Sequence, residues 1–133
     1  MKIEEIEGIG PAHAAKLGTA GVETTDHLLE RAGSAAGREA LATQTGHSTQ
    51  VLLEWVNHVD LMRINGVGSE YADLLEAAGV DSVPELAQRN AANLAAALAQ
   101  TNESKKLVRL VPTEASVTKW IEEAKTLPKV VTH

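Results

Sequence analysis

The chain repeats itself, and this repeat constrains the fold more than any other feature of the sequence. A shift of 58 positions (66 − 8) places "IEGIGPAH" over "INGVGSEY" and Gly21 over Gly79. Further along, the shift becomes 65 (120 − 55) and places Trp55 over Trp120. The second copy therefore has seven extra residues (65 − 58), which fall around "SKKLVRL". A repeat of this length predicts two copies of one supersecondary unit, over residues 1–60 and 61–133.

Both copies have the pattern of short helices. Apolar residues recur three and four positions apart in "AHAAKLGTA" and "EYADLLEAA", and Gly21 and Gly79 are suited to end these two helices. Pro11 stands where a helix begins, a position at which its missing N–H costs nothing. Residues that cap helix N-termini precede the later apolar runs: Thr24 or Thr25, Ser34, Ser48 or Thr49, Ser82, Asn90 and Thr113.

The fold class that follows is all-α. No segment alternates at period two, and the hydrophobic 44% of the chain contains no Phe, two Trp and one Tyr, so that Ala, Leu and Val form the core. We expect two tandem units of about four to five short helices each, with the helix around 49–62 as their junction. Because there is no Cys, disulfides and thiolate metal sites are excluded.

Charge is distributed unevenly along the chain. Residues 1–102 carry 6 Lys and Arg against 14 Asp and Glu, or −8, whereas residues 103–133 carry 6 against 4, or +2. The basic cluster Lys105, Lys106 and Arg109 coincides with the insertion near 104–110. The net charge of −6 argues against a surface built entirely for nucleic acid. The N-terminus has no secretory pattern and the chain has no long apolar run, so we expect a cytoplasmic protein without a membrane partner.

The stretch "IEGIGPAHAAKLGTAGVETTDHLLE" resembles a helix-hairpin-helix motif. It has the form hydrophobic-Gly-hydrophobic-Gly followed by a helix with Ala four residues after the second Gly, a place that Ala14 and Ala72 hold in the two copies. The continuation "GREALATQTGHSTQVLLEWVNHV" is similar to the second half of the small helical domains that precede the core of archaeal recombinases. The whole chain, including "LMRINGVGSEYADLLEAAGVDSVPELAQRN" and "LPKVVTH", closely resembles the bacterial family called domain of unknown function 4332, which has no firmly assigned function.

The helix-hairpin-helix resemblance implies binding to the backbone of DNA or RNA without sequence readout. The second glycine lets a phosphate approach, and the amides that open the next helix donate to it. Donors would be the amides of Gly8, Gly10 and Ala12 in one copy and those of Gly66, Gly68 and Ser69 in the other. Side chains expected near the nucleic acid are His13, Lys16, Arg63, Lys105, Lys106 and Arg109.

A second interpretation needs no ligand. A Gly-x-Gly turn is also a tight way to join two packed helices, and Glu4, Glu5 and Glu7 crowd the first turn while Glu70, Asp73 and Glu76 line the helix after the second. The protein would then be an adaptor or scaffold that binds a protein partner or a second copy of itself. Charge favours the adaptor and the fold resemblance favours nucleic acid; we expect nucleic-acid binding, with the adaptor as the alternative.

Other chemistry finds little support in the sequence. The histidines at positions 13, 27, 47, 58 and 133 show no paired metal-ligand spacing, and no Ser stands in a nucleophile motif. Trp55 and Trp120 recur on the apolar stripe of a helix, which indicates core packing. We therefore expect a non-catalytic protein with no cofactor and no metal.

Overall fold

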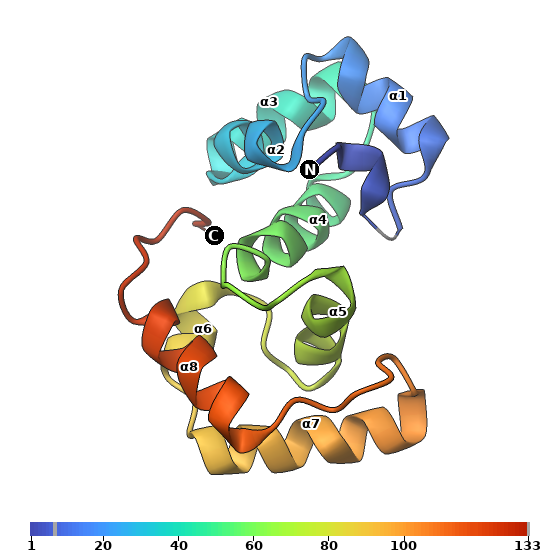
Figure 1. Ribbon diagram of the computed structural model, residues 1–133. Coiled ribbons are helices and arrows are strands. Elements are labelled where there is room, and N and C mark those ends of the chain that lie inside the picture. The colour runs from blue at the N-terminus through green and yellow to red at the C-terminus, as the bar shows by residue number, and fades with distance from the viewer. Residues whose placement is uncertain (7, 133) are drawn as a thin grey trace. The chain divides into compact units, whose positions relative to one another are not determined.

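The computed structural model describes residues 1–6 and 8–132, and these residues form a short 3₁₀ turn and eight α-helices without a β-sheet (Figure 1). The all-α prediction is confirmed. The elements are η1 (Ile3–Glu5), α1 (Pro11–Thr19), α2 (Thr25–Ala32), α3 (Ala35–Thr45), α4 (Thr49–Leu61), α5 (Ser69–Ala77), α6 (Val83–Ala87), α7 (Ala91–Lys105) and α8 (Glu114–Ala124).

The chain forms two compact units. Unit 1 comprises Met1–Asp60 together with the chain from Val130 onward, and unit 2 comprises Leu61–Lys129. The boundary falls in the last turn of α4. Residues 130–132 pack on unit 1, whereas the sequence alone assigns them to the second repeat.

The helix caps of the two units pair at shifts of 58 (82 − 24), 56 (90 − 34) and 65 (113 − 48), close to the shifts of the sequence. In each cap a hydroxyl or amide oxygen accepts a hydrogen bond from the amide three residues later, which satisfies one of the unpaired donors at a helix N-terminus. The predicted caps are confirmed, with Thr24 and Ser48 chosen from the pairs left open. The bonds are Thr24 with His27 (3.1 Å), Ser34 with Gly37 (3.0 Å), Ser48 with Val51 (3.1 Å), Ser82 with Glu85 (3.3 Å), Asn90 with Asn93 (3.0 Å) and Thr113 with Ser116 (3.1 Å).

Matching arginines tie the helices of each unit together. Arg31 on α2 donates to the carbonyl oxygen of Ala20 at 2.8 Å, and Arg89 after α6 donates to that of Gly79 at 3.1 Å. Both acceptors lie in the turn that ends the preceding helix, α1 or α5, where main-chain carbonyls lack helical partners. Each arginine therefore holds the end of the preceding helix in its own unit by the same type of hydrogen bond.

Each unit has its own apolar core. In unit 1 the core side chains that are fully buried include Leu17, Val22, Leu28, Leu41 and Leu52. In unit 2 the core gathers residues from α5 to α8, among them Leu74, Leu75, Leu86, Leu98, Val117 and Ile121. Leu and Val dominate both sets, as the composition predicts.

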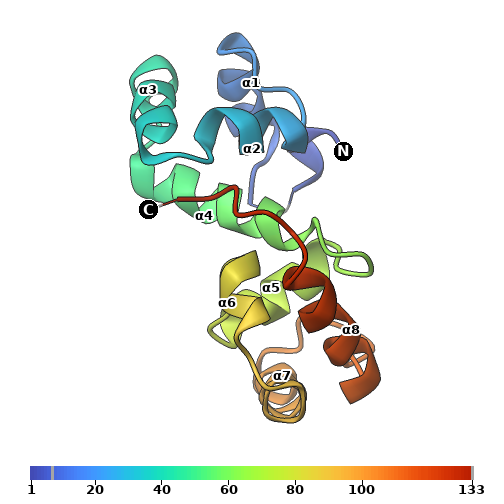
Figure 2. The same ribbon diagram turned by 90° about the vertical axis from the view of Figure 1, so that its left-hand side faces the viewer.

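The C-terminal segment completes unit 1. Figure 2 shows it, at the red end of the chain, ending among the helices of unit 1. Thr132 donates its amide to the carbonyl of Gly33 at 2.8 Å, and Arg38 donates to the carbonyls of Ala32 and Gly33, each at 2.9 Å, and to that of Thr132. The Arg38 side chain is buried, which lowers its pKa, and its charge is stabilised by these carbonyl dipoles.

Gly33→Ala should destabilise unit 1. A Cβ at this position would lie 2.6 Å from the carbonyl oxygen of Leu29 and 2.8 Å from that of Val130, so the backbone must shift. We expect a loss of about 1–3 kcal/mol in the free energy of unfolding, measured by urea denaturation and circular dichroism. Gly18→Ala in α1 is the matched control, since a Cβ there meets no atom within 4 Å, and it should stabilise the helix by about 0.5–1 kcal/mol. Equal effects of the two substitutions would contradict the close packing at Gly33.

Candidate nucleic-acid interface

The two Gly-x-Gly turns have the same backbone. Gly8 and Gly66 have φ values of +91° and +89°, in the left-handed region that favours glycine. Gly10 (φ −55°, ψ 180°) and the extended Gly68 (φ −92°, ψ −171°) follow and are the N-caps of α1 and α5. In Figure 1 the first turn joins η1 to α1 and the second joins α4 to α5. The predicted equivalence of the two glycine pairs is present in the structure, and turn 1 (residues 6–10) and turn 2 (residues 64–68) can be compared directly.

Turn 1 leaves its backbone open. A Cβ at Gly8 or Gly10 would meet no atom within 4 Å. Pro11 begins α1 and has no N–H, so Ala12 and His13 carry the amides at its N-terminus, where no helical acceptor exists. The first turn of α1 also lacks an acidic side chain. These amides are available to an anion, which the positive end of the helix dipole would attract.

Side chains of unit 2 itself contact turn 2. The amide of Asn65 donates to a carboxylate oxygen of Glu123 at 3.1 Å, and a Cβ at Gly66 would lie 3.2 Å from Nε1 of Trp120. The first turn of α5 contains Glu70, a negative charge next to the amides that a phosphate would need. The structure therefore separates two turns that the sequence treats as a pair, and turn 1 is the better anion site.

The predicted cations near the turns have different surroundings. Arg63 donates to the carbonyl oxygen of Pro128 at 3.0 Å and so ties turn 2 to the end of unit 2. Lys16 is exposed in the last turn of α1, away from the amides that open this helix. Ser69, predicted as a donor, begins α5 and is half-buried.

Acidic side chains surround turn 1 as the sequence indicates. Glu4 and Glu5 are exposed, and Glu5 accepts a hydrogen bond from the amide of Lys2 at 3.1 Å. Glu7, the third predicted acidic neighbour, and His133 lie outside the described residues. An anion at turn 1 would thus be held by main-chain amides close to repelling carboxylates.

The basic segment, residues 105–110, comprises the last residue of α7 and the ordered loop that follows it. The loop starts at Lys106, the C-cap of α7, which has a φ of +51°. The side-chain amide of Asn102 accepts a hydrogen bond from the N–H of Val108 (2.9 Å) and donates one to its C=O (3.0 Å). The hydroxyl of Tyr71 donates to the carbonyl of Leu110 at 2.8 Å. Lys105, Lys106 and Arg109 are exposed, and within residues 1–6 and 8–132 no ion pair engages them.

A ring pair repeats beside the turns, which sequence reasoning missed. His13 packs on Trp55 with a centroid distance of 5.4 Å and an angle of 56°, and Tyr71 packs on Trp120 at 5.3 Å and 52°. The shift of 58 (71 − 13) could have revealed the match between His13 and Tyr71. Both tryptophans are buried, so they pack the core and offer no exposed face for stacking on a base.

His47 adds a third ring in unit 1 alone. Its ring centroid lies 5.1 Å from that of His13 and 5.0 Å from that of Trp55, and Pro112 holds the matching position in unit 2. Nε2 of His47 is buried without a hydrogen-bond partner among the residues that the structure describes. Burial, followed by the positive charges of His13 and Lys16, lowers the pKa of His47. The cluster is therefore built around a neutral imidazole.

Unit 1 should lose stability as the pH falls below about 6.5, the ordinary histidine value. In the unfolded chain His47 binds a proton at a higher pH than in the folded state, so unfolding is favoured as the pH approaches the lowered pKa. We expect the free energy of unfolding, followed by tryptophan fluorescence in urea, to be smaller at pH 5.5 than at pH 7.5. His47→Gln should reduce this difference, and an unchanged difference in the variant would contradict the assignment.

Comparison with known proteins identifies one match. The family model described as "Domain of unknown function (DUF4332)" matches residues 7–127, most of the chain. No curated protein and no solved structure matches it. In the described part of the chain, none of the helices combines the length and the apolar composition needed to span a bilayer.

Proposed function

We propose that this chain, which belongs to the DUF4332 family, binds the backbone of nucleic acids without reading their sequence. Its Gly-x-Gly turns would be helix-hairpin-helix motifs, and turn 1 would hold a phosphate on the amides of Gly10, Ala12 and His13. The observation that carries the proposal is the open backbone of turn 1 at the N-terminus of α1. A phosphate fits this place because main-chain donors and the helix dipole both favour an anion.

The basic segment would supply the remaining phosphate contacts. Lys105, Lys106 and Arg109 are exposed on a loop whose backbone Asn102 and Tyr71 hold in place. Contacts of this kind position a protein on the backbone and carry no sequence information. Few cations take part, so binding should be weak and sensitive to salt.

Gly10→Asp should weaken binding without harming the fold. Gly10 is an N-cap with free space around it, and Asp is a preferred N-cap residue, so stability should stay level or rise by a few tenths of a kcal/mol. The new carboxylate would compete with the phosphate for the same amides, which should weaken binding by at least about tenfold. The measurement is a fluorescence anisotropy titration with labelled single-stranded and duplex oligonucleotides at low salt.

Gly68→Asp is the matched control, because Gly68 is also an N-cap with no atom within 4 Å of a Cβ. It should change binding much less, since turn 2 already has Glu123 and Glu70 beside its amides. Equal losses in both variants would reassign the site to both turns. No binding by the unaltered protein at tens of micromolar would refute the proposal.

Removal of the three basic charges should flatten the salt dependence. In the triple variant Lys105→Gln, Lys106→Asn and Arg109→Gln, Asn is chosen because it tolerates the left-handed conformation of residue 106. Three lost phosphate contacts should reduce the slope of log K against log salt by roughly 2.7 on duplex DNA. A slope equal to that of the unaltered protein would show that the basic segment does not touch the phosphates.

An adaptor function is the second candidate. It is favoured by the exposed side chains of Leu107 (36%) and Leu110 (74%), which phosphate binding leaves unused. Exposed leucines beside cations are typical of a surface that meets an apolar and acidic partner.

A further inference from the structure

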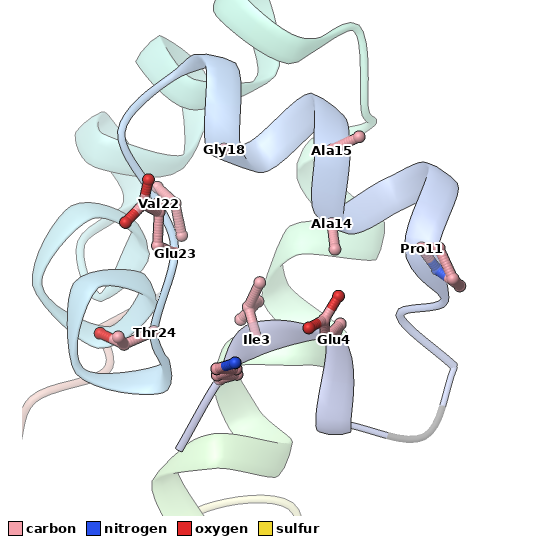
Figure 3. A pocket seen from close by; sticks show the side chains of 10 residues that line it. Ile3, Glu4, Pro11, Ala14, Ala15, Gly18, Val22, Glu23 and Thr24 are labelled. Atoms are coloured by element: carbon pink, nitrogen blue, oxygen red, sulfur yellow. The ribbon is translucent and has the colours of Figure 1, made fainter.

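Unit 1 contains an apolar groove between η1 and α1. Its volume is about 470 Å³, and Figure 3 shows Ala14 of α1 directed toward η1, with Val22 on the far wall. Apolar walls come from Ile3, Pro11, Ala14, Ala15, Gly18 and Val22, and the polar rim comes from Lys2, Glu4, Glu23 and Thr24. A space of this size accommodates several apolar side chains of a partner.

The repeat shows why unit 1 has open space here. At the shift of 58, Ala15 and Gly18 correspond to Asp73 and Glu76 of unit 2. The small residues of α1 leave space where α5 carries two longer side chains. The groove therefore arises from a difference between the copies, as does the basic segment, which belongs to unit 2 alone.

The basic segment carries an apolar tip that matches the groove. Among the described residues, the large apolar side chains that are exposed are those of Met1, Leu107 and Leu110. The two leucines stand among Lys105, Lys106 and Arg109, and the bonds of Asn102 and Tyr71 fix the loop that presents them. Little conformational entropy would be lost when such a loop docks.

The negative charge of unit 1 favours it as the surface that the basic segment of another copy contacts. Residues 1–60 and 130–133 carry 4 Lys and Arg against 9 Asp and Glu, or −5, and Glu4 and Glu23 line the groove itself. An anionic bilayer would also attract the three cations, but the remainder of the chain carries −9 (−6 − 3) and would be repelled. An acidic groove on another copy fits both the cations and the leucines.

We propose that Leu107 and Leu110 of one copy insert into the unit 1 groove of a second copy, with the neighbouring cations facing Glu4 and Glu23. Each copy has one groove and one segment, so the contact is head-to-tail. Such contacts close into a ring or extend into a chain. This self-association goes beyond nucleic-acid binding and uses the groove, which the phosphate site does not include.

The test uses two variants that each lose one half of the contact. The segment variant is Leu107→Ser with Leu110→Ser. The groove variant is Ala15→Gln with Gly18→Gln, which fills the space with side chains as long as the longer one in unit 2 and leaves the charge unchanged. Both pairs lie at positions that are not fully buried, and circular dichroism checks their folding.

Mass is measured by sedimentation velocity from about 10 to 500 µM, a range suited to a small interface. The mass of the unaltered protein should rise with concentration, whereas each variant alone should stay monomeric. An equal mixture of the variants should form a dimer and nothing larger, because only one groove and one segment remain intact. A monomeric unaltered protein, variants that associate like it, or a mixture without a dimer would each overturn the proposal.

Two further arms separate this proposal from the other ligands of the basic segment. The groove variant should bind labelled oligonucleotide at least as tightly as the unaltered protein does, since turn 1 keeps its amides and the basic segment is not covered by a second copy, so self-association can fail while the proposed function stands. Vesicles of phosphatidylserine and phosphatidylcholine should not sediment the unaltered protein. Sedimentation that is lost in the segment variant and kept in the groove variant would assign the leucines to a membrane surface instead.

Discussion

The left-handed glycine before the first long helix of each unit is the constraint on which the rest of the structure depends. With Gly8 at φ +91°, the chain reverses within a few residues, and Ile6 and Ile9 on either side of it are both buried in the core. Gly66 does the same for Ile64 and Val67. Burial of each such side chain contributes about 1.5–3 kcal/mol to the free energy of unfolding. A residue other than glycine would be strained at this φ, and relief of the strain would disturb this burial. The same reversal precedes the N-termini of α1 and α5, so the packing of each unit and the proposed phosphate contact at α1 would depend on the same turn.

The two copies keep the features that hold a helical unit together and differ in those that meet other molecules. Caps, the Arg31 and Arg89 contacts, the glycine turns and the ring pairs occur in both. The differences are the carboxylate of Glu123 at turn 2, the groove beside Ala15 and Gly18, and the basic segment. Since a fold does not imply a function, these differences are where function is to be sought.

Local signals made most of the fold predictable. Thr24, Ser82 and Asn90 cap helices because their side chains reach an amide three residues away, a relation that is visible in the sequence. Contacts between distant residues were not predictable. Asn65 meets Glu123 across 58 positions, and Arg38 meets Thr132 across 94. Nothing in the local pattern of either residue reveals its partner, because tertiary packing alone brings them together. The two glycine turns were therefore predictable from the sequence, but the difference between an open turn and an occupied one was not.

Electrostatics decides how the open turn can act in an acidic unit. Unit 1 carries −5, so on the proposed function a phosphate would be repelled at long range and attracted only at contact, where amides would replace its water. At physiological salt the Debye length is about 8 Å, which screens the distant carboxylates but not the amides at the bonded oxygen. Added salt thus weakens two opposing terms: the repulsion from unit 1 and the attraction of Lys105, Lys106 and Arg109. The net salt slope of the proposed binding would be shallower than three cations alone would produce, and it would steepen when carboxylates such as Glu4 or Glu5 are neutralised, because the repulsion is then smaller.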